Sequence, residues 1–157
     1  MPPKVYIETT IPSYLTARPS RDLIIAGHHQ LTREWWDNQR GEFDLNVSQF
    51  VIQECAAGDP EMVKKRLEIL SGITILPISP AVIPLAETLI NKGPLPRKAE
   101  IDAVHISVAA TSGMDYLLTW NCKHIANARM QDAIRELCIE AGFKPPVICT
   151  PEELLGD

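Results

Sequence analysis

The sequence lacks long apolar runs, a signal peptide and any excess of positive charge. No apolar stretch in its 157 residues approaches the roughly 20 residues that a membrane-spanning helix needs. The first residues have neither the basic segment nor the apolar core of a secretory signal peptide. The length fits one globular unit. We therefore expect a single cytoplasmic domain over residues 1–157, with no membrane segment.

Basic charge is in deficit, with 15 Lys and Arg against 20 Asp and Glu and a net charge of −5. Broad, nonspecific binding to nucleic acid depends on clustered Lys and Arg, so the overall charge argues against it. A local basic rim stays compatible with this charge, although such groups more often form only a solvated helix face. The candidates for that rim are Lys64, Lys65, Arg66, Arg97, Lys98 and Lys123.

Closely spaced cysteines are also missing. Cys55, Cys122, Cys138 and Cys149 are far apart and form no C-x-x-C pair, so we expect small core residues rather than disulfides or zinc ligands. Cys122 and His124 are the only pair near enough to suggest a metal, and a zinc site needs two further ligands.

Several catalytic signatures are absent. There is no G-x-G-x-x-G after the first expected strand and no G-x-x-x-x-G-K-[ST], so dinucleotide and phosphate-loop functions lose their main support. No G-x-S-x-G nucleophile elbow occurs either.

What the sequence does contain is an alternation of short apolar runs and amphipathic segments. The apolar runs predict strands at residues 5–7, 44–47, 73–76, 116–118 and 147–149. Two helices are expected in each of the first three connections and one in the fourth. This order predicts an α/β fold: three layers, with a mostly parallel five-stranded sheet and helices on both faces.

Capping residues mark several of the expected helix starts. Ser48, Asp59 before Pro60, and Ser79 before Pro80 are typical of helix N-termini. Residues 150–153 have the pattern of a capping box, which predicts a short final helix. Trp35 and Trp36 are adjacent on one expected helix and can hardly both be fully buried, so one of them is a candidate for a dimer face.

Three acids fall at informative places in this pattern. Glu8 ends the first strand, Glu54 lies on the helix after the second strand, and Asp102 lies early on the helix before the fourth. If the strand order reverses beside the first strand, the three carboxylates converge at the carboxyl edge of the sheet. Clustered carboxylates repel unless cations neutralise them, and Mg²⁺ or Mn²⁺ suits oxygen ligands. Glu8 could instead satisfy backbone donors of the next helix, and Glu54 could simply face solvent.

Four segments carry a resemblance to a known family. VYIETTIPSYL, VIQEC with the following AAGD, EIDAVHISVAA and DYLLTWNCKHIAN, spread across residues 4 to 127, resemble the four motif blocks of the PIN-domain family, in its VapC-like or PilT-N-terminus-like branch. The resemblance implies a metal-dependent ribonuclease, often the toxin of a toxin–antitoxin pair, with a parallel sheet and a homodimer. Matching the motif positions makes Glu8, Glu54 and Asp102 the metal-binding acids.

Two positions depart from the family pattern. Glu8 stands where the family usually has aspartate, and Asn121, a neutral side chain, stands at the fourth acidic position. The lost charge should weaken binding of a second ion in particular. We still count Asn121 with the catalytic set.

Weaker candidates surround these residues. Thr9, Thr10 and Ser13 would hydrogen-bond metal-bound water or phosphate, and Lys123, Arg97 or Lys98 would steer the RNA. His105 lies one helical turn from Asp102 and could orient that carboxylate or a phosphate; a purely structural role for it is equally compatible with the sequence.

Hydrolysis of an RNA phosphodiester by a metal-activated water is the function expected from this pattern. The alternative is a catalytically weak or inactive module of the same fold that binds RNA or a protein partner. A phospho-acceptor receiver would need its aspartate at the end of a central strand, and the sequence has none there. The expected partners are RNA, an antitoxin protein and a second copy of the chain.

Overall fold

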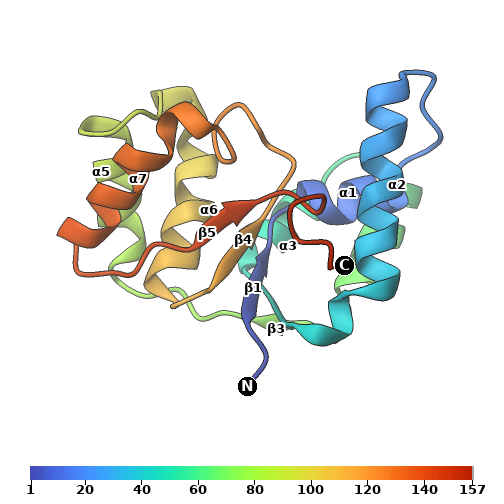
Figure 1. The fold of residues 1–157 in the computed structure, drawn as a ribbon, viewed down its shortest axis with the longest axis horizontal. Helices are drawn as coiled ribbons and strands as arrows, with labels where there is room; N and C mark the ends of the chain where they lie inside the picture. Colours follow the sequence, from blue (N-terminus) through green and yellow to red (C-terminus); the bar gives the residue numbers. More distant parts are fainter. Residues whose placement is uncertain (157) are drawn as a thin grey trace.

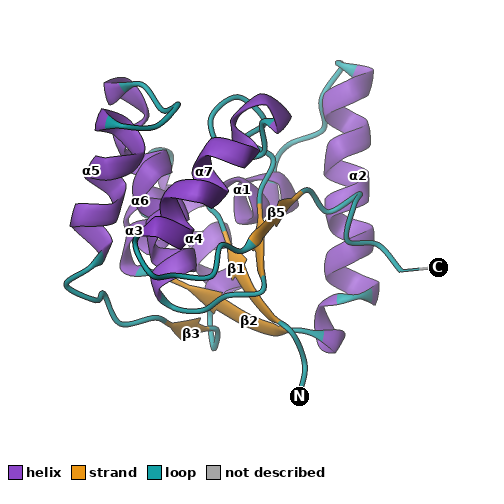
Figure 2. Ribbon diagram, turned by 60° about the vertical axis from the view of Figure 1, so that its left-hand side comes forward, coloured by secondary structure: helices purple, strands orange, loops and turns teal. Residues whose placement is uncertain are grey.

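Five parallel strands form one sheet in the order β3-β2-β1-β4-β5. The computed structural model describes residues 1–156. Figure 2 shows β1 within the sheet, and the register pairs it with β2 on one side and β4 on the other. The predicted α/β fold and the reversal of strand order beside the first strand are confirmed. The strands are β1 Lys4–Ile7, β2 Asp44–Val47, β3 Thr74–Ile75, β4 Tyr116–Leu118 and β5 Val147–Cys149.

The central strands are buried on both faces. Val5, Tyr6 and Ile7 of β1 are fully buried, as are Leu117 and Leu118 of β4. Continuous apolar runs of this kind are typical of parallel strands covered by helices on both sides. The edge strands β3 and β5 are short, which limits pairing with other chains.

Helices cover both faces of the sheet. On one side α1 packs against α2 and α4, and on the other α5 packs against α6 and α7; Figure 1 shows α5, α6 and α7 on the side away from α2. Two short 3-10 helices cover residues 40–42 and 97–99. The α-helices are α1 Thr10–Thr16, α2 Leu23–Asn38, α3 Gln49–Cys55, α4 Pro60–Leu70, α5 Val82–Asn91, α6 Glu100–Thr111 and α7 Ala128–Glu140.

Helix α6 lies deep in the molecule. Every residue from 103 to 110 is buried, so the helix has almost no solvent-facing side beyond its first turn. The apolar Ile101 is 39% exposed, whereas the polar His105 is fully buried. A buried imidazole needs hydrogen-bond partners, and these lie in the candidate site described below.

Some local expectations are wrong. The Ser48 and Asp59 side chains make no capping hydrogen bonds, and α5 begins at Val82 rather than at Pro80. Residues 151–154 form turns, not a helix. The capping-box bond is nevertheless present, because the Thr150 amide donates to Glu153 Oε1 at 3.0 Å. Within the described part of the chain, no helix is both long and apolar enough to cross a membrane.

The expectation about the adjacent tryptophans is also wrong. Trp35 is fully buried and Trp36 is only 8% exposed. The Arg40 guanidinium lies over the Trp36 ring, 4.8 Å from its centroid, and packs an otherwise exposed aromatic face. The pair therefore offers no aromatic surface to a second copy of the chain.

The cysteines behave largely as predicted. All four thiols are free, and Cys55, Cys138 and Cys149 are buried whereas Cys122 is exposed. Burial raises the pKa of Cys55 to about 11 and that of Cys149 to about 12, so these buried thiols stay protonated and unreactive at neutral pH.

Candidate active site

Glu8 lies where β1 and β4 end side by side. Its backbone amide donates to the Leu118 carbonyl at 3.1 Å, which extends the pairing of the two strands by one step. The side chain is only 4% exposed. A buried carboxylate at this edge of a parallel sheet is in the position where ligands of open α/β folds bind.

One oxygen of Glu8 holds two loops together. Oε1 accepts hydrogen bonds from Thr10 Oγ1 at 2.5 Å, from Thr119 Oγ1 at 2.6 Å and from the Thr10 amide at 3.2 Å. The two hydroxyls in turn accept from the amides of Trp120 and Asn121, at 2.8 and 2.9 Å. Glu8 thus accepts a bond from one backbone amide of α1, which is the alternative role that the sequence suggested for it. It also fixes the turn after β4.

The second carboxylate oxygen of Glu8 is not engaged by the described residues. Among residues 1–156, no hydrogen bond to Glu8 Oε2 is formed, and this oxygen is not among the polar atoms sealed away from solvent. It is therefore free to bind a ligand.

Glu54 is held by a chain of buried polar groups. Its Oε1 contacts His105 Nε2 at 2.5 Å and accepts from Thr9 Oγ1 at 2.6 Å. His105 Nδ1 contacts the Tyr6 hydroxyl at 2.7 Å, and that hydroxyl contacts Ser48 Oγ at 2.8 Å. This explains why Ser48 does not cap α3. Glu54 does not simply face solvent: its side chain is 35% exposed, but Thr9, just before α1, and His105 of α6 both bond its carboxylate.

The direction of these bonds follows from the carboxylate. An ionised Glu54 only accepts, so Nε2 of His105 donates to it. The Tyr6 hydroxyl bonds the other ring nitrogen, Nδ1. As in Glu8, the partners use one oxygen, and Oε2 of Glu54 has no hydrogen bond within the described residues. His105 therefore orients Glu54, whereas the sequence suggested Asp102 or a phosphate.

Asp102 has partners for both oxygens. Oδ1 accepts from Asn121 Nδ2 at 2.9 Å, and Oδ2 contacts His124 Nδ1 at 3.2 Å. Asn121 Oδ1 also accepts from the His124 amide at 3.0 Å. Asp102 thereby joins the start of α6 to the turn after β4, where Asn121 and His124 lie.

One neighbour, His105, influences the pKa of all three acids. Burial raises the pKa of Glu8, against the opposing influence of His105 and the two threonine hydroxyls. Burial likewise raises the pKa of Asp102; His124 and His105 oppose this, and the nearby Glu54 charge adds to it. Burial also acts to raise the pKa of Glu54, but the hydrogen bonds from His105 and Thr9 outweigh it and the pKa is lowered. His105 thus acts electrostatically on all three carboxylates.

The donor set suits a hydrated hard cation. In the described part of the chain, no three His, Cys, Asp or Glu side chains are arranged closely enough to enclose an ion by themselves. Mg²⁺, however, usually keeps several waters and takes only one or two carboxylates. Glu8 and Glu54 each have one oxygen without a hydrogen bond from the described residues, so each could supply one such ligand. Binding of Mg²⁺ or Mn²⁺ here stays a prediction.

The weaker candidates differ in whether their side chains bond the acids. Thr9 and Thr10 donate to Glu54 and Glu8, so they position the acids. The Ser13 hydroxyl bonds none of the acids, whereas Lys123 is exposed on the turn that carries Asn121.

Half of the proposed basic rim is already engaged. Arg97 pairs with Glu87 at 3.0 Å and Lys65 with Glu61 at 3.7 Å. Arg66 donates to the carbonyls of Cys55 and Ala57 at the end of α3. Lys64 and Lys98 are exposed and form no ion pair with the described residues. Only part of the rim is therefore available to steer RNA.

Three residues of the site were not among the candidates: Tyr6, Ser48 and Thr119. His124 was considered only as a metal-binding partner of Cys122, and it contacts Asp102. Thr119 follows β4 directly and could have been suspected from that position, because polar residues at the end of a parallel strand often line a site. Tyr6 and Ser48 carry no such signal, because a tyrosine in an apolar strand and a serine before a helix have ordinary structural explanations.

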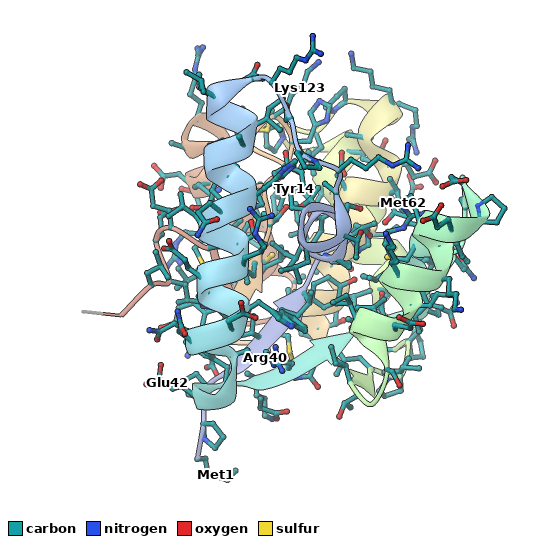
Figure 3. The ribbon with its side chains drawn as sticks, turned by 90° about the vertical axis from the view of Figure 1, so that its right-hand side faces the viewer. Met1, Tyr14, Arg40, Glu42, Met62 and Lys123 are labelled. Atoms are coloured by element: carbon teal, nitrogen blue, oxygen red, sulfur yellow. The ribbon has the colours of Figure 1, made fainter. Side chains whose placement is uncertain are left out.

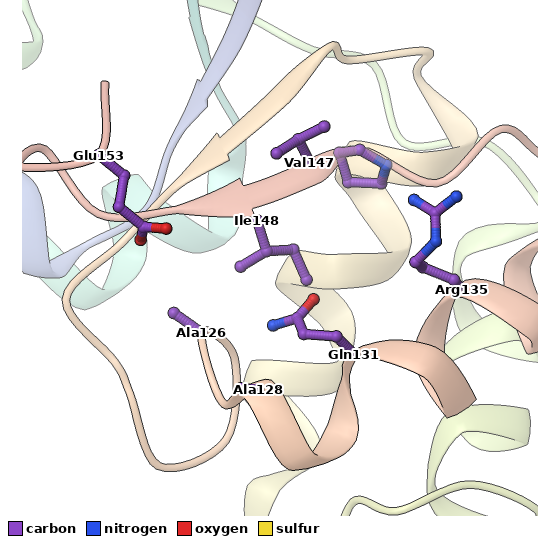
Figure 4. A pocket seen from close by; sticks show the side chains of 8 residues that line it. Ala126, Ala128, Gln131, Arg135, Val147, Ile148 and Glu153 are labelled. Carbon is purple, nitrogen blue, oxygen red and sulfur yellow. The ribbon is translucent and has the colours of Figure 1, made fainter. Parts of the chain in front are cut away.

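A separate pocket lies between α7 and β5 (Figure 4). Gln131 and Arg135 of α7 line it together with Ile148 and Glu153. It contains none of the predicted acids. Gln131 is already bonded to the Ile125 carbonyl at 3.0 Å.

Comparison with solved structures gives a likeness of fold. No family model matches the sequence, and no curated protein matches it. The structure is similar to a chain in the crystal structure of VapBC2 from Rickettsia felis, bound to a DNA fragment from their promoter, with a TM-score of 0.60 and 16% sequence identity. The similarity covers 94% of this chain and 98% of that one. At this identity the likeness concerns the fold, and this chain shares the fold of that VapBC2 chain over nearly its whole length.

Proposed function

We propose that this protein is a cytoplasmic, metal-dependent endoribonuclease of the PIN-domain family, acting as the toxin of a toxin–antitoxin pair. One observation carries the proposal: Glu8 and Glu54, from β1 and α3, each have one carboxylate oxygen fixed and one free, and Asp102 shares their electrostatic environment. The fold shared with the VapBC2 chain supports it.

Glu8, Glu54 and Asp102 would hold Mg²⁺ or Mn²⁺. Such an ion, when bound, lowers the pKa of water and offsets negative charge at a phosphate. The protein's own contribution is positional. His105 and Thr9 fix Glu54, and Thr10 and Thr119 fix Glu8. Asn121 and His124 hold Asp102 toward the same edge of the sheet.

RNA would approach over the turn after β4. Lys123 is exposed there and attracts the phosphate backbone of a strand whose scissile phosphate lies at the acids. The net charge of −5 limits binding elsewhere on the surface, which suits recognition of a single-stranded segment rather than broad coating of nucleic acid.

The first experiment is cleavage of single-stranded RNA with Mn²⁺, with and without EDTA. We expect cleavage by the wild-type protein only when the metal is present, and at least about 100-fold less by Asp102→Asn, because a mispositioned ligand set costs roughly that much. Asp115→Asn is the matched control, since Asp115 lies at the other end of the sheet and contacts only the Lys4 amide. Equal cleavage in every lane would remove the nuclease proposal.

A second candidate is a binding module without catalytic activity. It is favoured by the neutral Asn121 and by the engagement of both Asp102 oxygens. Calorimetric titration with Mn²⁺ separates the two: an enzyme shows saturable binding at millimolar concentration or below, and the inactive module shows none.

The partner proposals are an antitoxin protein and a second copy of this chain. The similar structure is of a VapBC2 assembly with DNA, which supports the antitoxin. Light scattering of the purified protein tests the homodimer: a mass of one chain across the concentration range would reject it.

A further inference from the structure

Three aromatic side chains are stacked beside the acids. The His28 ring lies flat on the Trp120 indole, with centroids 4.0 Å apart and planes 14° apart. Tyr14 is nearly parallel to the same indole, with centroids 6.0 Å apart and planes 13° apart. These rings come from α1, α2 and the turn after β4, so only the tertiary structure brings them together.

The Trp120 ring is fixed at both ends. Its indole N–H donates to Thr32 Oγ1 at 2.7 Å, and its backbone amide donates to Thr10 Oγ1 at 2.8 Å. The ring itself is buried, and His28 and Tyr14 are partly exposed. A rigid indole therefore supports two more accessible rings, so little conformational entropy is lost when a flat ligand stacks on them.

This stack adjoins the proposed site directly. The Thr10 hydroxyl that receives the Trp120 amide also donates to Glu8, and the residues on either side of Trp120 contact Glu8 and Asp102. Figure 3 labels Tyr14 of α1, in the view that faces α1 and α2. A strand with its phosphate at the acids would have a neighbouring nucleotide within reach of the rings.

A cation also lies next to the rings. The edge of Tyr14 meets the buried His29 ring, with centroids 4.9 Å apart, and His29 lines a small pocket with Arg33 and Ser20. Arg33 bonds Gln30 at 3.2 Å and forms no ion pair with an acid of the described residues. Aromatic rings combined with an uncompensated cation are typical of sites for single-stranded nucleic acid.

We infer that Tyr14 and His28, supported by Trp120, stack one unpaired base of a single-stranded RNA next to the scissile phosphate. The inference rests on the proposed function and adds a substrate-positioning subsite to it. Stacking is tolerant of base identity because every base has a π face. The subsite therefore selects unpaired over paired RNA and does not by itself read sequence.

The test measures binding without cleavage. A fluorescein-labelled single-stranded RNA of about eight nucleotides, near the size that one single-strand-binding fold covers, is titrated in EDTA and followed by fluorescence anisotropy. His28→Leu keeps the bulk of the side chain and removes the aromatic ring, and His28→Phe restores a ring. We expect roughly tenfold weaker binding for His28→Leu and near wild-type binding for His28→Phe.

Two controls sharpen the result. Asn38→Ala alters an exposed residue of the same helix outside the stack and away from Arg33, and should leave affinity unchanged. An oligomer of the same length that carries abasic sites should bind the wild-type protein as weakly as the intact RNA binds His28→Leu. Tyr14→Leu provides an independent variant and should also weaken binding, whether or not His28→Leu folds fully.

The outcomes separate this inference from the nuclease proposal. Equal affinities of wild type, His28→Leu and Tyr14→Leu would overturn the subsite while Mn²⁺-dependent cleavage could still be present. Ring-dependent binding without cleavage would support the subsite and reject the nuclease. If the wild-type protein does not bind RNA, both fail.

Discussion

The two ends of the sheet differ in the burial and bonding of their polar side chains. At the carboxyl end, Glu8 and His105 are buried and bonded to other side chains. At the amino end, Asp115 accepts a 2.8 Å bond from the Lys4 amide near the surface. Three connections there turn through glycines with positive φ: Gly72, Gly113 and Gly142. The amino end of the sheet mainly joins helices to strands, whereas the carboxyl end accumulates buried charge.

This difference indicates what each end is for. Burying a carboxylate costs free energy that hydrogen bonds only partly offset, and the raised pKa values of Glu8 and Asp102 reflect that cost. Proteins tend to keep such costly groups at functional sites. We therefore expect substitutions at the carboxyl end to affect activity more than stability, and substitutions at the amino end to do the reverse.

The largest effect is expected for Glu8→Gln. The glutamine oxygen can keep the three hydrogen bonds that Oε1 accepts, so the change removes mainly charge and one ligand atom. Cleavage should fall at least about 100-fold. Without metal, the melting temperature at neutral pH should rise by about 2–4 °C, the shift that roughly 1 kcal/mol produces in a chain of this size.

The pH dependence of that stabilisation follows from the raised pKa of Glu8. The folded state favours the protonated carboxyl, so this contribution is complete below the unfolded pKa and is lost as pH rises through the folded pKa. The gain from Glu8→Gln should therefore appear at neutral pH and vanish in acid. Calorimetry at both pH values checks it, and a lower melting temperature at neutral pH would contradict it.

A smaller effect on activity is expected for His105→Gln. Glu54 loses the partner that orients it, and the Tyr6 hydroxyl loses its bond to the ring. Mn²⁺-dependent cleavage should therefore drop roughly tenfold. The free energy of unfolding should fall by about 2 kcal/mol. Ser107→Ala is the matched control on α6. It removes a buried 2.6 Å bond to the Val82 carbonyl and should cost about 1 kcal/mol without changing the cleavage rate. Equal cleavage rates for the two variants would leave His105 a purely structural role.

The smallest effects on function are expected at glycines. Gly113 has a φ of 71° at the end of α6, so Gly113→Ala should cost about 1–2 kcal/mol. Gly27 lies inside α2 with nothing within 4 Å of an added Cβ, so Gly27→Ala should stabilise by about 0.5–1 kcal/mol. Denaturant unfolding measures both, and the rate of cleavage per folded molecule should stay at the wild-type value. A tenfold loss of activity in Gly113→Ala would break the contrast between the two ends.

Much of the fold could be predicted from local patterns. The second strand occupies residues 44–47 and the fifth residues 147–149, as the apolar runs predict. Short-range signals were less reliable where a distant group competed for the same atoms. Ser48 bonds Tyr6 instead of capping its helix, and Arg40 covers a tryptophan that the helical pattern alone leaves exposed.

The candidate site was only partly predictable. The positions of Glu8, Glu54 and Asp102 relative to strands and helices follow from the sequence, as does the reversal of strand order beside β1. The bonds that orient them do not. His105 meets Glu54 across a sequence separation of 51 residues, and its expected neighbour Asp102 is bonded by Asn121 and His124 instead.

The sequence by itself determined the periodicity, because the spacing of apolar residues decides which segments become strands or helices and in what order they alternate. It also determined which side chains could carry charge at the ends of strands. The tertiary structure alone decided which oxygen of each acid is occupied and which rings lie against Trp120. Those contacts join residues far apart in the chain, and their geometry depends on how whole elements pack against one another.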